Sequence, residues 1–117
     1  MLSSFATGMP EPDIRKYKSM PEFLERVWLG DAVMVRGCLA DERSRQRFLN
    51  QIDPDTGMNA LHIAVGRDLL DITKLLVEAG IEIIPDNEGR MPSLIAAICN
   101  VSDELAEYIY QVEERAP

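Results

Sequence analysis

The sequence predicts an all-α fold, a solenoid of about three helix-turn-helix repeats with short turn tips. Its centre holds two successive helical patterns: an apolar segment at 61–65 and apolar residues at helical spacing over 72–79. Gly57 permits the positive φ of a tight turn, and Gly80 can end the second helix in the left-handed conformation. A similar segment at 89–97 repeats the pattern, as expected of units that bury their apolar faces against each other.

This centre resembles an ankyrin repeat, because several residue types agree at fixed offsets. The family pattern reads glycine, any residue, Thr-Pro-Leu-His, any residue and Ala-Ala, followed later by Leu-Leu and a glycine. Asn59 and Ala60 replace the usual Thr-Pro, and Val65 replaces the second alanine. The resemblance is carried by Gly57, Ala60, Leu61, His62, Ala64, Leu75, Leu76, Ala79 and Gly80.

A further copy of the pattern follows the central one. Gly89 lies 32 residues after Gly57, whereas the usual ankyrin spacing is about 33 residues. Proline and the Ala-Ala pair return in this copy, but Ser93 and Leu94 stand where Leu and His are usual. With an opening repeat upstream, the resemblance covers about residues 20–115.

The N-terminal part of the chain shows little periodic pattern. We expect a flexible N-terminal arm at 1–18, which contains one glycine and two prolines, followed by the repeat domain at 19–117. Ser19 and Glu22 fit a capping box for a first helix that runs to about Leu29.

The opening repeat continues with a second helix at 32–39 after the helix-breaking Gly30. The connection at 41–51 is longer than usual, and we interpret it as a short extra helix. Its inward side is expected to hold Phe48, Leu49 and Ile52. Three arginines in this segment alternate and do not share one helix face: Arg43, Arg45 and Arg47. They could contact an acidic partner, but we favour a solvated face neutralised by nearby carboxylates.

The central repeat runs from 53 to 85, with helices near 60–67 and 71–79. The last repeat has a helix at 92–99, a left-handed turn at Asn100 and a final helix capped by Ser102. That helix should pack through Leu105, Tyr108, Ile109 and Val112. Its outer face should be polar, as a terminal capping repeat requires, through Glu104, Glu107, Glu113 and Glu114. The core between repeats should include Leu61, Ala64, Leu75 and Leu76.

Candidate chemical groups are few. The resemblance implies that His62, the single histidine, hydrogen-bonds turn backbone and locks neighbouring repeats. One imidazole and two distant cysteines, Cys38 and Cys99, give no metal-ligand spacing. The segment 53–57 starts like a calcium loop but lacks the later ligands, so we interpret it as a turn. We therefore expect no metal, no cofactor and no enzymatic activity.

The formal charge of −8, from 20 acidic and 12 basic side chains, disfavours nucleic acid. It suits a basic protein partner, or it serves solubility alone. No apolar run approaches the roughly 18 residues of a membrane span, and the N-terminus does not resemble a signal peptide. The two cysteines are expected to be free buried thiols in a reducing compartment, which we take to be the cytoplasm.

The resemblance implies a binding surface formed by helix ends and turn tips on the concave side. Carried over to this chain, it comprises Trp28, Leu29, Asp55, Thr56, Met58, Gly66, Arg67, Asn87, Glu88, Arg90, Ile98 and Cys99. Trp28 and the arginines are the residue types that most often anchor interfaces. Alternatively, Trp28 packs under the N-terminal arm.

These observations indicate a non-enzymatic protein-recognition module, a small adaptor or protein inhibitor that is a monomer when free. One alternative is an immunity or antitoxin-like inhibitor of a basic protein, which charge and size suggest. The other is a thiol-dependent enzyme or small-molecule binder, which would need Cys38 or Cys99 to be exposed.

Overall fold

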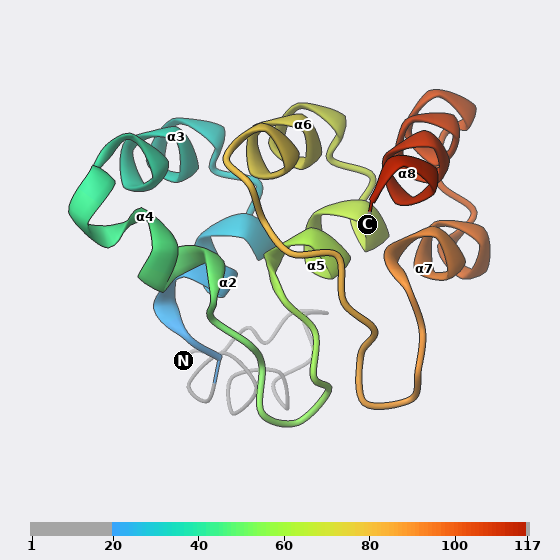
Figure 1. Cartoon of the computed structure of the whole chain (residues 1–117), viewed down its shortest axis with the longest axis horizontal. Coiled ribbons are helices and arrows are strands. Elements are labelled where there is room, and N and C mark those ends of the chain that lie inside the picture. Colours follow the sequence, from blue (N-terminus) through green and yellow to red (C-terminus); the bar gives the residue numbers. More distant parts are fainter. Residues whose placement is uncertain (1–19, 117) are drawn as a thin grey trace, which may run out of the picture.

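The structure is a computed structural model that describes residues 20–116. Within this range it contains helices and no strands, which confirms the all-α solenoid (Figure 1). The helices are α2 (Glu22–Trp28), α3 (Ala32–Ala40), α4 (Glu42–Leu49), α5 (Ala60–Gly66), α6 (Leu70–Glu78), α7 (Pro92–Cys99) and α8 (Asp103–Arg115). The expected arm at 1–18 and the capping residue Ser19 lie outside the described residues.

The helices form two layers of a short stack (Figure 1). One layer holds α2, α5 and α7 in that order, and the other holds α3, α6 and α8. Each repeat is therefore a pair, α2/α3, α5/α6 or α7/α8, and the loops at 50–59 and 80–91 extend from the stack on the same side. The short extra helix predicted within 41–51 is α4, which packs on α3.

The helix starts are secured in different ways. Asn59 caps α5 by accepting from the backbone N–H groups of Leu61 and His62, and its own N–H donates to His62 Nδ1 over 3.3 Å. Ser102 caps α8 as predicted. The helix α2 has Pro21 as its N-cap and Glu22 as its first helical residue, not its third as a capping box would need; the other residue of the predicted box, Ser19, lies outside the described residues.

The start of α7 is held by a side chain from α8. Its N-cap, Met91, offers no oxygen to the free N–H groups of the first turn. The Glu113 carboxylate takes this place: it accepts from both the N–H and the Oγ of Ser93, each over 2.6 Å. The expectation that Glu113 belongs to a solvated outer face is therefore wrong.

The turn tips explain the 32-residue spacing. The buried Asp53 accepts from the N–H of Asp55, and the buried Asp86, 33 residues later, accepts from the N–H of Glu88. The missing residue therefore lies inside the tip of the third repeat. The 53–57 segment is a turn, as predicted, and Gly57 has a φ of 76°. A Cβ there would collide with Asn87 of the neighbouring tip, so glycine is required for close approach as well as for conformation.

The core runs continuously through all three repeats. Leu61, Ala64 and Leu76 are completely buried, as predicted. Leu75 is only half-buried, because α6 presents it at the edge of the core. Ile52 is 44% exposed and not packed inward, since it follows the end of α4. Phe48 does pack inward, with its ring centroid 5.3 Å from that of Phe23.

Candidate binding surface

A hollow of about 410 Å³ lies along the layer of α2, α5 and α7, next to the turn tips. All three repeats contribute to its wall, and most of the contributors are apolar. The lining residues are Trp28, Met58, His62, Ile63, Gly66, Arg67, Arg90, Ile95, Ile98 and Cys99. The structure thus brings together seven of the residues that the sequence placed on a binding surface.

Arg67 and Trp28 form one wall of the hollow. The Arg67 Nε donates to the Trp28 carbonyl oxygen over 3.0 Å, and its guanidinium carbon lies 4.9 Å from the centroid of the indole ring. Arg67 is exposed, and no carboxylate within residues 20–116 pairs with it. Its two terminal nitrogens therefore remain available as forked donors for a carboxylate or a carbonyl.

Arg90 has a different role from the one that the sequence suggested. Its Nε donates to the buried Asp86 carboxylate over 2.8 Å, and another of its nitrogens lies 3.8 Å from Glu88 Oε1. Burial alone would raise the pKa of Asp86, but hydrogen bonds from Arg90 and Glu88 outweigh it and lower that pKa. The Asp86 side-chain bond raises the pKa of Arg90. Arg90 thus braces the turn tip beside the hollow.

His62 links the second repeat to the third, as predicted. Its Nδ1 lies 3.1 Å from Asn59 Oδ1, and its Nε2 lies 3.0 Å from the Arg90 carbonyl oxygen. Burial lowers the pKa of His62, so the neutral imidazole is favoured in the folded protein. With both ring nitrogens engaged, His62 is a structural residue at the base of the hollow.

The sequence comparison agrees with this architecture. The family model described as ankyrin repeats, in three copies, matches residues 31–115. The chain belongs to the ankyrin-repeat family. Ankyrin repeats are generally protein-interaction modules and are typically non-enzymatic. No curated protein matches the chain as a relative. The helix α2 precedes the matched range, yet it packs on α5 and completes the first ankyrin repeat.

The other predicted site residues do not line the hollow. Asp55 and Glu88 are exposed at the turn tips, and Leu29 is 62% exposed beyond the end of α2. Thr56 and Asn87 tie neighbouring tips together, because the Asn87 N–H donates to the Thr56 carbonyl oxygen over 2.9 Å. The tips therefore form a second, polar row next to the apolar hollow.

Sequence reasoning missed three lining residues, namely His62, Ile63 and Ile95. One signal was present in Gly66, a residue without a side chain that lines the hollow. A Cβ at Gly66 would lie 3.3 Å from Ile95 Cγ2 and 3.7 Å from the Cys99 sulfur. The glycine lets α7 approach α5 closely, and this approach places Ile95 in the wall.

The cysteines are free thiols, as expected, but only Cys38 is partly buried, whereas Cys99 is exposed in the hollow. The expectation of two buried thiols is wrong for Cys99, because it lies at the open end of α7. His62 lines the same hollow, but its ring nitrogens are already hydrogen-bonded and give Cys99 no base. Within residues 20–116, no three His, Cys, Asp or Glu side chains converge as a metal site would require.

No helix of the described chain, residues 20–116, is long and apolar enough to cross a membrane.

Proposed function

We propose that this chain is a protein-recognition module without enzymatic activity, a small ankyrin-repeat adaptor or protein inhibitor. It binds its partner through the hollow and the turn tips beside it. The observation that carries this proposal is the Trp28–Arg67 pair, which stands at an apolar hollow built from three repeats. Family membership supports the function class, and the geometry supports the face.

The hollow favours a partner segment of mixed chemistry. Met58 and Ile98 offer apolar surface, and Arg67 offers forked donors for a carboxylate or a backbone carbonyl. Around it, Asp55 and Glu88 at the tips add negative charge that suits lysine and arginine. An apolar side chain should enter the hollow, while basic groups contact the tips.

The charge of −8 supports a basic partner, because opposite charge speeds encounter in solution. A dedicated inhibitor, such as an immunity or antitoxin-like protein, is the form of this proposal that the charge favours. Free thiols suit a reducing compartment, so we place the protein in the cytoplasm. The net charge also favours a monomer in the absence of the partner.

A comparison of captured proteins tests the proposal. Lysate from the native cell is passed over the immobilised wild-type chain, an Arg67→Glu variant of the hollow, and an Arg43→Glu control at the far end of the stack. A protein retained by the wild type and the control, but lost by the hollow variant, is the expected result. Binding that persists in the hollow variant overturns the proposed face.

Labelling of Cys99 provides an independent test of where the partner binds. It is exposed in the hollow, whereas Cys38 is half-buried on α3, outside it. A maleimide should label Cys99 in the free protein, and the bound partner should slow this labelling while leaving Cys38 unchanged. Unchanged labelling of Cys99 in a saturated complex would place the partner elsewhere.

A further inference from the structure

The second and third ankyrin repeats match residue by residue at an offset of 32, from the helix start onward. Asn59 and Met91 are both N-caps, and Asp68 and Asn100 both adopt a positive φ, 61° and 55°. Some residues of the second repeat contact the third. Adding 32 to their numbers gives the equivalent positions of the third repeat.

In addition to the apolar packing of α5 on α7, the second repeat contacts the third through residues that are polar or lack a side chain. His62 reaches the Arg90 carbonyl oxygen, and Gly66 leaves room for Ile95 and Cys99. On the outer layer, the Lys74 ammonium lies 5.6 Å from the ring centroid of Tyr108. Glu78 is close enough for its charge to raise the pKa of Tyr108, although burial is the larger cause.

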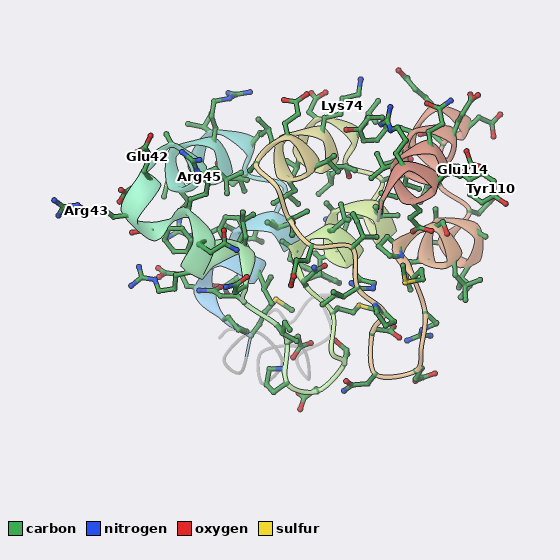
Figure 2. All side chains as sticks on the ribbon, viewed as in Figure 1. Glu42, Arg43, Arg45, Lys74, Tyr110 and Glu114 are labelled. Atoms are coloured by element: carbon green, nitrogen blue, oxygen red, sulfur yellow. The ribbon has the colours of Figure 1, made fainter. Side chains whose placement is uncertain are left out.

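The matching positions of the third repeat are Leu94, Ile98, Ala106 and Tyr110. Nothing within residues 20–116 stacks on them, and three are large apolar or aromatic side chains in solvent. Leu94 is 47% exposed, Ile98 58% and Tyr110 64%. Figure 2 shows Tyr110 at one end of the long axis, pointing away from the stack. We call these four residues the end face.

At these four positions the end face is thus more apolar than the second repeat, which has His62, Gly66, Lys74 and Glu78 there. A terminal repeat that only shields the core would carry polar residues at these positions. The polar capping face that the sequence suggested is present only in part: Glu107 and Glu114 flank Tyr110 at helical spacing, and Glu113 is turned to Ser93. Figure 2 shows Glu114 beside Tyr110.

The surrounding charge indicates what covers the end face. Over 92–115 the chain has five carboxylates and a single arginine, Arg115. Two copies meeting end face to end face would bring these carboxylates together, which costs free energy. At the other end of the stack, Arg45 donates to the Leu39 carbonyl oxygen and Arg47 lies over the Phe48 ring, so these two arginines are already engaged, whereas Arg43 is exposed. A head-to-tail second copy is therefore an occupant that the test below distinguishes.

We propose that the end face is a second docking surface, which binds a partner helix whose apolar stripe is flanked by lysine or arginine. The stripe packs on Leu94 and Tyr110 as the next layer of the stack would. The basic residues on either side reach Glu107 and Glu114. This surface is distinct from the hollow, which it meets only at Ile98.

The probe for this proposal is a synthetic peptide of about 20 residues, long enough to form a helix. It carries leucine at helical spacing and lysine elsewhere on that side, with a fluorescent label. A second peptide replaces every lysine by glutamate, and a third keeps the composition but scatters the leucines. Binding is followed by fluorescence anisotropy at low and moderate salt.

The lysine peptide should bind the wild type, and the other two peptides should bind at least tenfold more weakly. A Leu94→Ser/Tyr110→Ser variant should lose at least tenfold in affinity, and Glu107→Gln/Glu114→Gln should lose affinity and most of the salt dependence. Arg67→Lys in the hollow is the matched control and should bind like the wild type. The four residues changed in these variants, two on the end face and two beside it, are exposed, so thermal melts should be similar.

Three results would overturn the proposal. The first is equal binding of the lysine peptide by the wild type and Leu94→Ser/Tyr110→Ser. The second is loss of binding in Arg67→Lys, which would place the peptide in the hollow. The third is a concentration-dependent dimer, seen by sedimentation, that Leu94→Ser/Tyr110→Ser abolishes, because the occupant would then be a second copy.

Discussion

The two junctions between repeats share apolar packing but differ in the hydrogen bonds that accompany it. Between the second and third repeats, hydrogen bonds join His62 to the Arg90 carbonyl and Ser102 to the Asp68 carboxylate. Between the first and second, α2 packs on α5 through buried apolar side chains, and Arg67 adds one exposed bond to the Trp28 carbonyl. Hydrogen bonds constrain the relative orientation of two repeats, because they require a particular distance and angle, whereas the hydrophobic effect is not directional. The first junction should therefore tolerate small shifts that the second does not.

The largest expected effect comes from a residue on which the whole stack depends. Leu76→Ala should cost about 2–5 kcal/mol of unfolding free energy, because it leaves a cavity in the core of the central repeat. Urea unfolding followed by circular dichroism measures it. Leu75→Ala is the control: its half-buried side chain should cost clearly less. Equal losses for the two variants would contradict the position of α6.

His62→Gln tests the hydrogen-bonded junction and should cost about 1–3 kcal/mol at neutral pH, because buried partners lose their bonds. The cost should depend on pH. Burial lowers the pKa of His62 in the folded protein, so the unfolded chain takes up the proton first, from about pH 6.5 downward. Wild-type stability should therefore fall as the pH drops below that value.

Unfolding free energies at pH 7.5 and 5.5 provide the measurement. The gap between wild type and His62→Gln should narrow at the lower pH, since only the wild type carries the buried imidazole. A gap of constant size would mean that His62 is equally protonated in the folded and unfolded chains.

Thr73→Val tests whether a buried hydroxyl that takes part in neither junction contributes to the stability of the stack. Thr73 is completely buried, and its Oγ1 has no hydrogen-bond partner among the described residues. Removing the hydroxyl should raise the unfolding free energy by about 1 kcal/mol. A thermal melt shows this as a higher Tm. Thr73→Ser, which keeps the hydroxyl and removes the methyl group, should lower it.

Arg67→Lys should have the smallest effect on stability, below about 0.5 kcal/mol, because the contact with Trp28 is exposed. The same change removes the planar fork, so the affinity for the captured partner should fall while the melt stays constant. Calorimetric titration beside the melt separates the two quantities. A large drop in Tm would show that the first junction depends on this polar contact.

Local signals made most of the helices predictable. Gly57, Gly80 and Asn100 mark turns by their own backbone preferences, and the structure gives each a positive φ. Asp68 also adopts a positive φ. Aspartate tolerates this conformation, but it is a weaker sequence signal for it than glycine is. Ile52 was misplaced because an apolar residue just past a helix end has no periodicity to orient it.

The site was less predictable, because it depends on which groups are already engaged. The sequence places Arg67 at a helix end and Arg90 at a turn tip. It does not show that the Arg90 guanidinium is already bound to the Asp86 carboxylate. The role of Glu113 was also hidden, since Ser93 lies 20 residues away along the chain. Exposure of Cys99 follows from the packing of α7, which no local pattern encodes.

The Glu113–Ser93 contact also sets an order of events during synthesis. The first turn of α7 is completed by a carboxylate near the end of α8, so α7 stays frayed at its start until α8 has left the ribosome and docked. The central repeat needs no such wait, because Asn59 caps α5 from the adjacent residue. A chain truncated before Glu113 would therefore present a finished central repeat followed by an unfinished one. Proteases that recognise frayed segments would find 91–95 in that chain and not in the completed protein.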